Sequence, residues 1–194
     1  MTIRNSRTRP ILLALGLLFG PSTTARAQGF ITPYIGFNFG GDASCPEITG
    51  CEDKKLNFGA SIGKMGKVLG VEEEFGYAKD FFGSAPGLES SVFTAMSNIM
   101  IVPDFGPVRP YVLAGVGLIK SHVDLTSLSV LTSNNNSFGW DVGGGVMVLF
   151  GGHAGVRGDL RYFHAFQDLE LLGFTLENSK IDFGRVSAGL VLTF

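Results

Sequence analysis

Charged residues occupy every second position of the segment GVRGDLRYF at 155–163, where Arg157, Asp159 and Arg161 alternate with small and apolar residues. Successive side chains of a β-strand point to opposite faces, so these three charges would share one face of a strand. The opposite face collects Val156, Gly158, Leu160 and Tyr162. Such a strand suits either a soluble sheet with one wet side or a barrel with a polar inside and lipid outside.

Four more charged residues fall on the polar face of other alternating segments. Glu72 and Glu74 lie in GVEEEFGYAKDFFG, Asp141 lies in GWDVGGGVMVLF, and Arg185 lies near the end of the chain. Inside a closed barrel these side chains would have to neutralise one another, because a buried charge without a partner is costly. We therefore predict one interior charge network: Glu72, Glu74, Asp141, Arg157, Asp159, Arg161 and Arg185.

The three histidines, His122, His153 and His164, could serve an enzyme only beside a nucleophile. Ser121 and His122 are neighbours in sequence, so in a strand their side chains point to opposite faces. His153 falls in a short glycine-rich turn. We predict no catalytic residue, no metal site and no cofactor.

The two cysteines, Cys45 and Cys51, lie in the polar stretch GGDASCPEITGCEDKK. In an exported chain, two nearby cysteines in such a loop favour a disulfide. Metal binding by the cysteines with Glu52 and Asp53 is the alternative, but no histidine lies nearby.

The first 27 residues have the three parts of an export signal. Three arginines precede a short apolar stretch at 11–20, and the small residues of Ala25-Arg26-Ala27 favour cleavage before Gln28. We thus expect residues 1–27 to be a signal peptide and 28–194 to be one domain. Its 11 basic and 17 acidic residues, without a basic run, argue against a nucleic-acid partner.

Eight segments of the remaining chain alternate with a period of two residues. We predict strands at 30–40, 55–63, 68–79, 91–102, 108–119, 138–149, 154–163 and 181–194. The connections between them alternate between long and short. The short ones, GKMGK, PDFGP and FGGH, suit tight turns, and the long ones span 41–54, 80–90, 120–137 and 164–180.

This alternation places every tight turn at one end of an up-and-down meander and every long loop at the other, as in bacterial outer-membrane barrels. We predict an all-β fold, a closed eight-stranded antiparallel up-and-down transmembrane β-barrel. Its apolar face points to lipid, and its small and charged residues fill a narrow lumen. Strands three and seven lie opposite each other, so Arg157 and Arg161 could reach Glu72 and Glu74. Glu73 faces outward in this register, unless a bulge shifts it or it lies near the headgroups.

The chain resembles the small outer-membrane β-barrel proteins of the OmpA/OmpX type, the porin-family barrel domain. The resemblance rests on the segments GVEEEFGYAKDFFG, RPYVLAGVGLIK, GWDVGGGVMVLF, GVRGDLRYF and SAGLVLTF. It implies a closed barrel in the outer membrane of a Gram-negative-type bacterium, surrounded by lipid. It also implies that the barrel-assembly machinery reads the C-terminal signal formed by Leu190, Leu192 and Phe194.

The function that these observations favour is non-enzymatic, structural or in surface recognition, through four long external loops. The partners we expect are outer-membrane lipid and the assembly machinery, and we expect a monomer. Three alternatives stay open: a narrow pore, a membrane-embedded lipid-modifying enzyme, and a soluble lipocalin-like barrel with its apolar face turned inward.

Overall fold

The computed structural model describes residues 27–41, 55–79, 81, 88–125, 131–151, 153–171 and 174–194. Within these ranges, only the backbone is described for residues 88–89, 123–125, 131–135, 167–171 and 174–180. Its strands are β1 (Gln28–Phe39), β2 (Lys55–Met65), β3 (Leu69–Lys79), β4 (Leu88–Ile101), β5 (Val108–Leu125), β6 (Leu131–Phe150), β7 (Ala154–Leu171) and β8 (Phe174–Thr193). Across these ranges no helix is long and apolar enough to cross a membrane.

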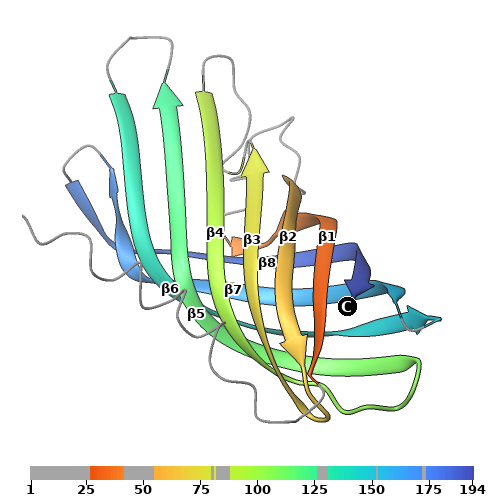
Figure 1. The fold of residues 1–194 in the computed structure, drawn as a ribbon. Coiled ribbons are helices and arrows are strands. Elements are labelled where there is room, and N and C mark those ends of the chain that lie inside the picture. Colours follow the sequence, from red (N-terminus) through yellow and green to blue (C-terminus); the bar gives the residue numbers. More distant parts are fainter. Residues whose placement is uncertain are drawn as a thin grey trace, which may run out of the picture.

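The eight strands form one closed antiparallel barrel in sequence order, which confirms the predicted fold class (Figure 1). β1 pairs with β8 to close it, and at this seam Gly29 and Phe194 exchange two backbone hydrogen bonds of 2.9 Å. The stagger of the barrel can be counted by stepping from each residue to its register partner on the next strand. Starting at Gly29 on β1, these steps pass through every strand and return to β1 at Phe39, ten residues further on. This stagger fixes the tilt of the strands and leaves an interior that side chains can fill.

The three short turns lie at one end of the barrel, as predicted, at 66–68, 102–107 and 151–153. Two glycines there have left-handed φ values that other residues rarely adopt, Gly106 at 80° and Gly151 at 61°. Asp104 Oδ1 accepts a 3.0 Å hydrogen bond from the Gly106 amide and fixes the turn before β5.

The prediction of four long loops is wrong for the third and fourth connections. β5 and β6 stay paired out to Leu125 and Leu131, and β7 and β8 stay paired out to Leu171 and Phe174. The segments 120–137 and 164–180 are rich in loop-favouring residues, but ladder hydrogen bonds between the two arms override that local preference. Figure 1 shows the β5–β6 hairpin extending well beyond the end of β3.

Apolar side chains point outward along the whole described wall, as the alternation predicts. Ile35, Val116 and Leu190 are each 57–60% exposed, which excludes a barrel that turns its apolar face inward. A wall with apolar residues outside and polar residues inside suits hydrocarbon and not water.

The lumen contains apolar layers that the sequence analysis did not predict. The loop-end cluster is formed by Ala78, Phe81, Val92, Met96, Ile119, Phe163, Ala165, Ile181 and Phe183. The turn-end cluster is formed by Phe30, Met65, Met100, Val102, Tyr111, Leu113, Met147, Leu149 and Val191. The expectation of small and charged residues alone was wrong, because inward positions nearer the strand ends carry these large side chains.

Candidate functional site

The seven charged residues predicted for the interior all lie inside the barrel, between the two apolar clusters. Each is at most 7% exposed. We call the set Glu72, Glu74, Asp141, Arg157, Asp159, Arg161 and Arg185 the charge layer. Alternation aims each side chain inward, and barrel closure brings β3, β6, β7 and β8 to face one another across the lumen.

Arg157 joins opposite walls of the barrel at the turn-end side of the charge layer. Its guanidinium pairs with Glu72 on β3, and Nη2 lies 2.9 Å from Asp159 Oδ2 on its own strand. Arg157 Nε donates to the Tyr111 hydroxyl at 2.6 Å, and that hydroxyl donates to Asp159 Oδ2 at 2.5 Å. Charge-assisted hydrogen bonds of this kind compensate for the removal of the charges from water.

Arg161 lies among all the carboxylates of the charge layer. Its Nη2 is 2.7 Å from Glu72 Oε1, and its Nε is 2.7 Å from Asp159 Oδ1. Nη1 pairs with Glu74 and lies 3.4 Å from Asp141 Oδ2. The planar guanidinium has five N–H donors, so one side chain can serve several carboxylates.

Arg185 connects the charge layer to the loop-end cluster. Its Nη2 pairs with Glu74, and its guanidinium carbon lies 4.4 Å from the centre of the Phe163 ring. The Phe163 ring stacks in turn on Phe183 with centroids 4.8 Å apart. A cation over an aromatic face is a favourable contact, so the charged and apolar layers adjoin without a gap of solvent.

Little space remains between these side chains. The void in the charge layer has a volume of about 10 Å³, and Thr32, Tyr34 and Ser61 lie on its wall together with charged groups. That is about the smallest volume that holds one water molecule. The centre of the lumen is therefore packed.

Four residues that hydrogen-bond to the charge layer were not assigned to it from the sequence. Tyr34 donates to Glu74 Oε1 at 3.1 Å, and Ser61 Oγ accepts from Arg157 Nη1 at 3.4 Å. Tyr111 bridges Arg157 and Asp159, as described above. Asn98, with its amide nitrogen turned toward Asp141, donates to both carboxylate oxygens at 2.7 and 3.3 Å, and its oxygen accepts from Arg161 at 3.1 Å. The alternation of the sequence could have indicated that the last two side chains point inward, because Tyr111 comes directly before the outward Val112 and Asn98 directly before the outward Ile99.

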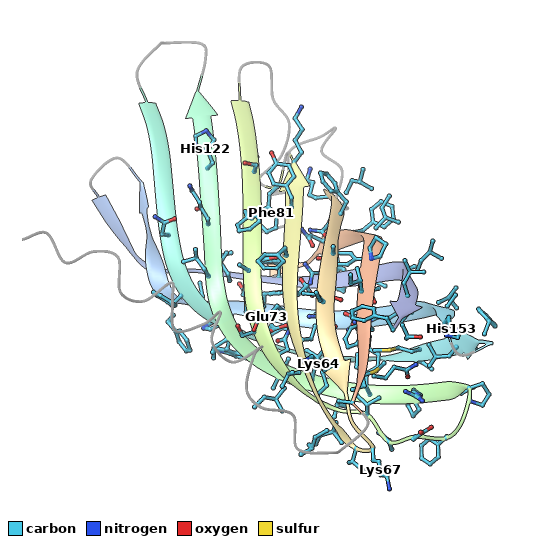
Figure 2. All side chains as sticks on the ribbon, in the orientation of Figure 1. Lys64, Lys67, Glu73, Phe81, His122 and His153 are labelled. Atoms are coloured by element: carbon cyan, nitrogen blue, oxygen red, sulfur yellow. The ribbon has the colours of Figure 1, made fainter. Side chains whose placement is uncertain are left out.

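Glu73 faces outward, and its register is regular. It pairs with Ile62 on β2 and Ser97 on β4, so no bulge displaces it. It is the fifth of eleven residues of β3, and Figure 2 shows it between Phe81 toward one end and Lys67 at the other. Its carboxylate Oε2 accepts a 2.7 Å hydrogen bond from Ser97 Oγ.

The remaining predicted residues are not part of this site. Leu190, Leu192 and Phe194 point outward on β8 and just beyond it, 52–71% exposed. Cys45, Cys51 and residues 1–26 of the predicted signal peptide (1–27) lie outside the described residues. The histidines lie apart, His122 on β5, His153 in a turn and His164 on β7. In the part of the chain that the structure describes, no group of histidine, cysteine and acidic side chains could hold a metal ion.

The closed barrel with its apolar exterior and paired interior charges defines the class of outer-membrane β-barrel proteins. The family model of the outer membrane protein beta-barrel domain matches residues 11–194, and the chain belongs to this family. No curated protein matches the sequence.

Solved structures with the same fold come from several bacteria. Neisserial surface protein A (NspA) is 18% identical with a TM-score of 0.64, over 86% of this chain and 97% of that one. OprG from Pseudomonas aeruginosa is 14% identical with a TM-score of 0.59, over 88% and 97%. Ail, the attachment invasion locus protein of Yersinia pestis, is 13% identical with a TM-score of 0.57, over 87% and 98%. At these identities the likeness shows the fold alone.

Proposed function

We propose that this chain is a non-enzymatic outer-membrane protein with a closed lumen, whose work is structural or lies in recognition at its external end. The observation that carries the proposal is the packed centre of the lumen. The charge layer spans the barrel between two apolar clusters, and the void within it has room for about one water molecule.

A closed lumen separates this proposal from a narrow pore. Ions would have to displace paired guanidinium and carboxylate groups and also pass two layers of apolar side chains. Single-channel recording in planar bilayers tests this, with a wide porin as the positive control. We expect no sustained conductance, and a stable open level of porin size would refute the closed lumen.

The external role is supported by the hairpins that continue past the apolar wall. β5–β6 and β7–β8 extend at the end opposite the three short turns. Loops and hairpin tips on a rigid scaffold are where binding residues concentrate. NspA is described as a surface protein and Ail as an attachment protein.

A shortened hairpin distinguishes the structural role from recognition. The variant replaces residues 122–134 with an Asn-Gly turn between the register partners Ser121 and Asn135, and it keeps β4 paired with β5 from Val92 to Ile101. In cells that lack the native protein, a structural role predicts that this variant restores resistance to hydrophobic dyes. A recognition role predicts that only the full-length chain restores adhesion. The proposal fails if the full-length chain restores neither.

A lipid-modifying enzyme is the remaining alternative. It would need a nucleophile and a base within hydrogen-bond reach at the lipid boundary. Mass spectrometry of lipid A from cells with and without the protein tests it. We expect identical acyl chains, and their loss would identify an enzyme.

Export and assembly complete the proposal. The signal peptide is cleaved before Gln28, and the machinery recognises the outward Leu190, Leu192 and Phe194. N-terminal sequencing of protein from outer-membrane fractions should begin at Gln28. Phe194→Ser should lower the yield of folded barrel, whereas an N-terminus at Met1 or an unchanged yield would contradict these two points.

A further inference from the structure

One polar pair interrupts the apolar wall halfway along β3. Glu73 and Ser97 are register partners on β3 and β4, and both side chains face outward. Their neighbours along β3 and β4 on this face are apolar, namely Val71, Phe75 and Ile99. A further charged residue of the same outer face, Lys64 on β2, is the register partner of Val71. In a barrel of this family that face meets hydrocarbon.

A carboxylate in this place has few partners. Ser97 Oγ donates one hydrogen bond of 2.7 Å to Glu73 Oε2. An ionised carboxylate can accept about four, and lipid tails offer none. Ionisable residues in the membrane are costly and rare, and they mark contacts or functional sites.

The surface around this pair is complementary to itself. Glu73 supplies an acceptor and Ser97 a donor on adjacent strands. Beside them the exposed ring of Phe75 stands between two small register partners, Ala60 on β2 and Ala95 on β4. One surface thus carries a donor, an acceptor, a protruding ring and shallow positions for such a ring.

We propose that the β2–β4 face is a dimer interface that binds a second copy of this chain. A two-fold axis along the membrane normal, between β3 and β4, brings Glu73 of each copy opposite Ser97 of the other. The same axis brings each Phe75 opposite Ala95 of the other copy. A two-fold interface uses one patch twice, and this patch has both halves of each contact. Small and polar residues are the usual means of association within membranes. The proposal replaces the monomer expected from the sequence.

Cross-linking of single cysteines with a short bis-maleimide in lipid bilayers tests the interface, because the two Ala95 positions lie diagonally across the axis and beyond the reach of a direct disulfide. In a background with Cys45→Ser and Cys51→Ser, Ala95→Cys places one thiol beside the proposed axis. Ala188→Cys is the matched control, an outward alanine on β8. The reagent should give covalent dimers for Ala95→Cys and monomers for Ala188→Cys. Equal cross-linking of both variants, or none for Ala95→Cys, would overturn the proposal.

Sedimentation equilibrium in detergent micelles tests the part of Glu73. Polar contacts within membranes are worth about 0.6 kcal/mol each on average, and the two-fold axis repeats the Glu73 contact, so Glu73→Leu should raise the dimer dissociation constant by about eightfold. Glu73→Gln keeps the hydrogen bonding and should stay within about twofold of wild type. Heat-dependent migration on gels checks that both variants are folded. A folded Glu73→Leu protein that dimerises like wild type would also overturn the proposal.

Discussion

Glu72, Glu73 and Glu74 are consecutive residues of β3, yet they meet two opposite environments. Glu72 and Glu74 point into the charge layer, where Arg157, Arg161 and Arg185 pair with them. Glu73 points to the outer wall, where a single hydroxyl donates to it. The two regions differ in which groups replace the hydration that a carboxylate loses when it is removed from water.

The lumen can hold many charges because they are brought together from several strands. Barrel closure supplies guanidinium groups from β7 and β8 to carboxylates on β3, β6 and β7. The outer wall offers only its two neighbouring strands. Within its own barrel, a lipid-facing carboxylate can therefore draw only on the adjacent strands, as Glu73 does with Ser97, whereas a lumenal one finds partners across the barrel.

The largest effect should follow removal of the residue that serves most of the charge layer. Arg161→Met should lower the free energy of unfolding by about 5 kcal/mol, the upper end for breaking a buried ionic network, because it leaves its carboxylates undercompensated. Urea unfolding in lipid vesicles measures it. Lys79→Met, at an exposed position at the end of β3, is the control and should change little. A loss below about 1 kcal/mol would contradict the buried ion pairs assigned to Arg161.

Two glutamates of the same strand test the difference between the lumen and the outer wall. Glu72→Gln should cost about 3 kcal/mol, since Arg157 and Arg161 each lose a charged partner. Glu73→Gln should stay within about 0.5 kcal/mol when measured on the monomer at low protein concentration. The measurement is the same unfolding experiment. Equal costs for both would mean that lumen and wall do not differ in the way described.

A smaller effect is expected for the Tyr111 hydroxyl, the uncharged group that connects Arg157 to Asp159 in the charge layer. Tyr111→Phe removes one hydroxyl that accepts from Arg157 and donates to Asp159. Both charged groups keep their direct ion pair, so the expected loss is about 1–2 kcal/mol. Denaturant midpoints at constant slope measure it. An effect as large as that of Arg161→Met would assign Tyr111 a larger role than the geometry gives it.

The smallest expected effect distinguishes two glycines on adjacent strands. A Cβ at Gly158 on β7 meets no atom within 4 Å, whereas one at Gly145 on β6 overlaps the Gly158 carbonyl oxygen and lies 2.5 Å from the Tyr111 hydroxyl oxygen. Gly158→Ala should therefore be neutral or stabilise by about 0.5 kcal/mol through lower chain entropy. Gly145→Ala should destabilise, because both the β7 backbone at Gly158 and the Tyr111 side chain would have to shift. Thermal unfolding of the two variants side by side checks the order, and a reversed order would be evidence against the packing described.

The sequence predicted the two faces of the wall better than the ends of its strands. Alternation alone places Leu190 outward and Arg185 inward, because a one-residue slip would expose every charge to lipid. The outer ends of β5 to β8 were not predicted, since stretches such as SNNNS at 133–137 resemble loops. Their strand structure comes from cross-strand hydrogen bonds, which a local reading does not include.

The charge layer was predicted by residue type, but its pairing was not. The sequence shows Arg157, Asp159 and Arg161 on one face, yet the position of Arg161 among the carboxylates depends on the stagger of the whole barrel. Large inward residues such as Phe163 and Met147 follow from the same alternation. Their gathering into two separate clusters depends on how far each strand is offset from the next.

The apolar clusters at both ends of the lumen have a consequence for the order of assembly. Once Phe30, Met147 and Leu149 close one end and Phe81, Phe163 and Phe183 the other, neither end offers a wide route for water. Hydration water of the seven charged side chains must therefore leave the interior before both clusters are fully packed. Dehydration of the charge layer and packing of the two ends are thus linked parts of the assembly of this barrel.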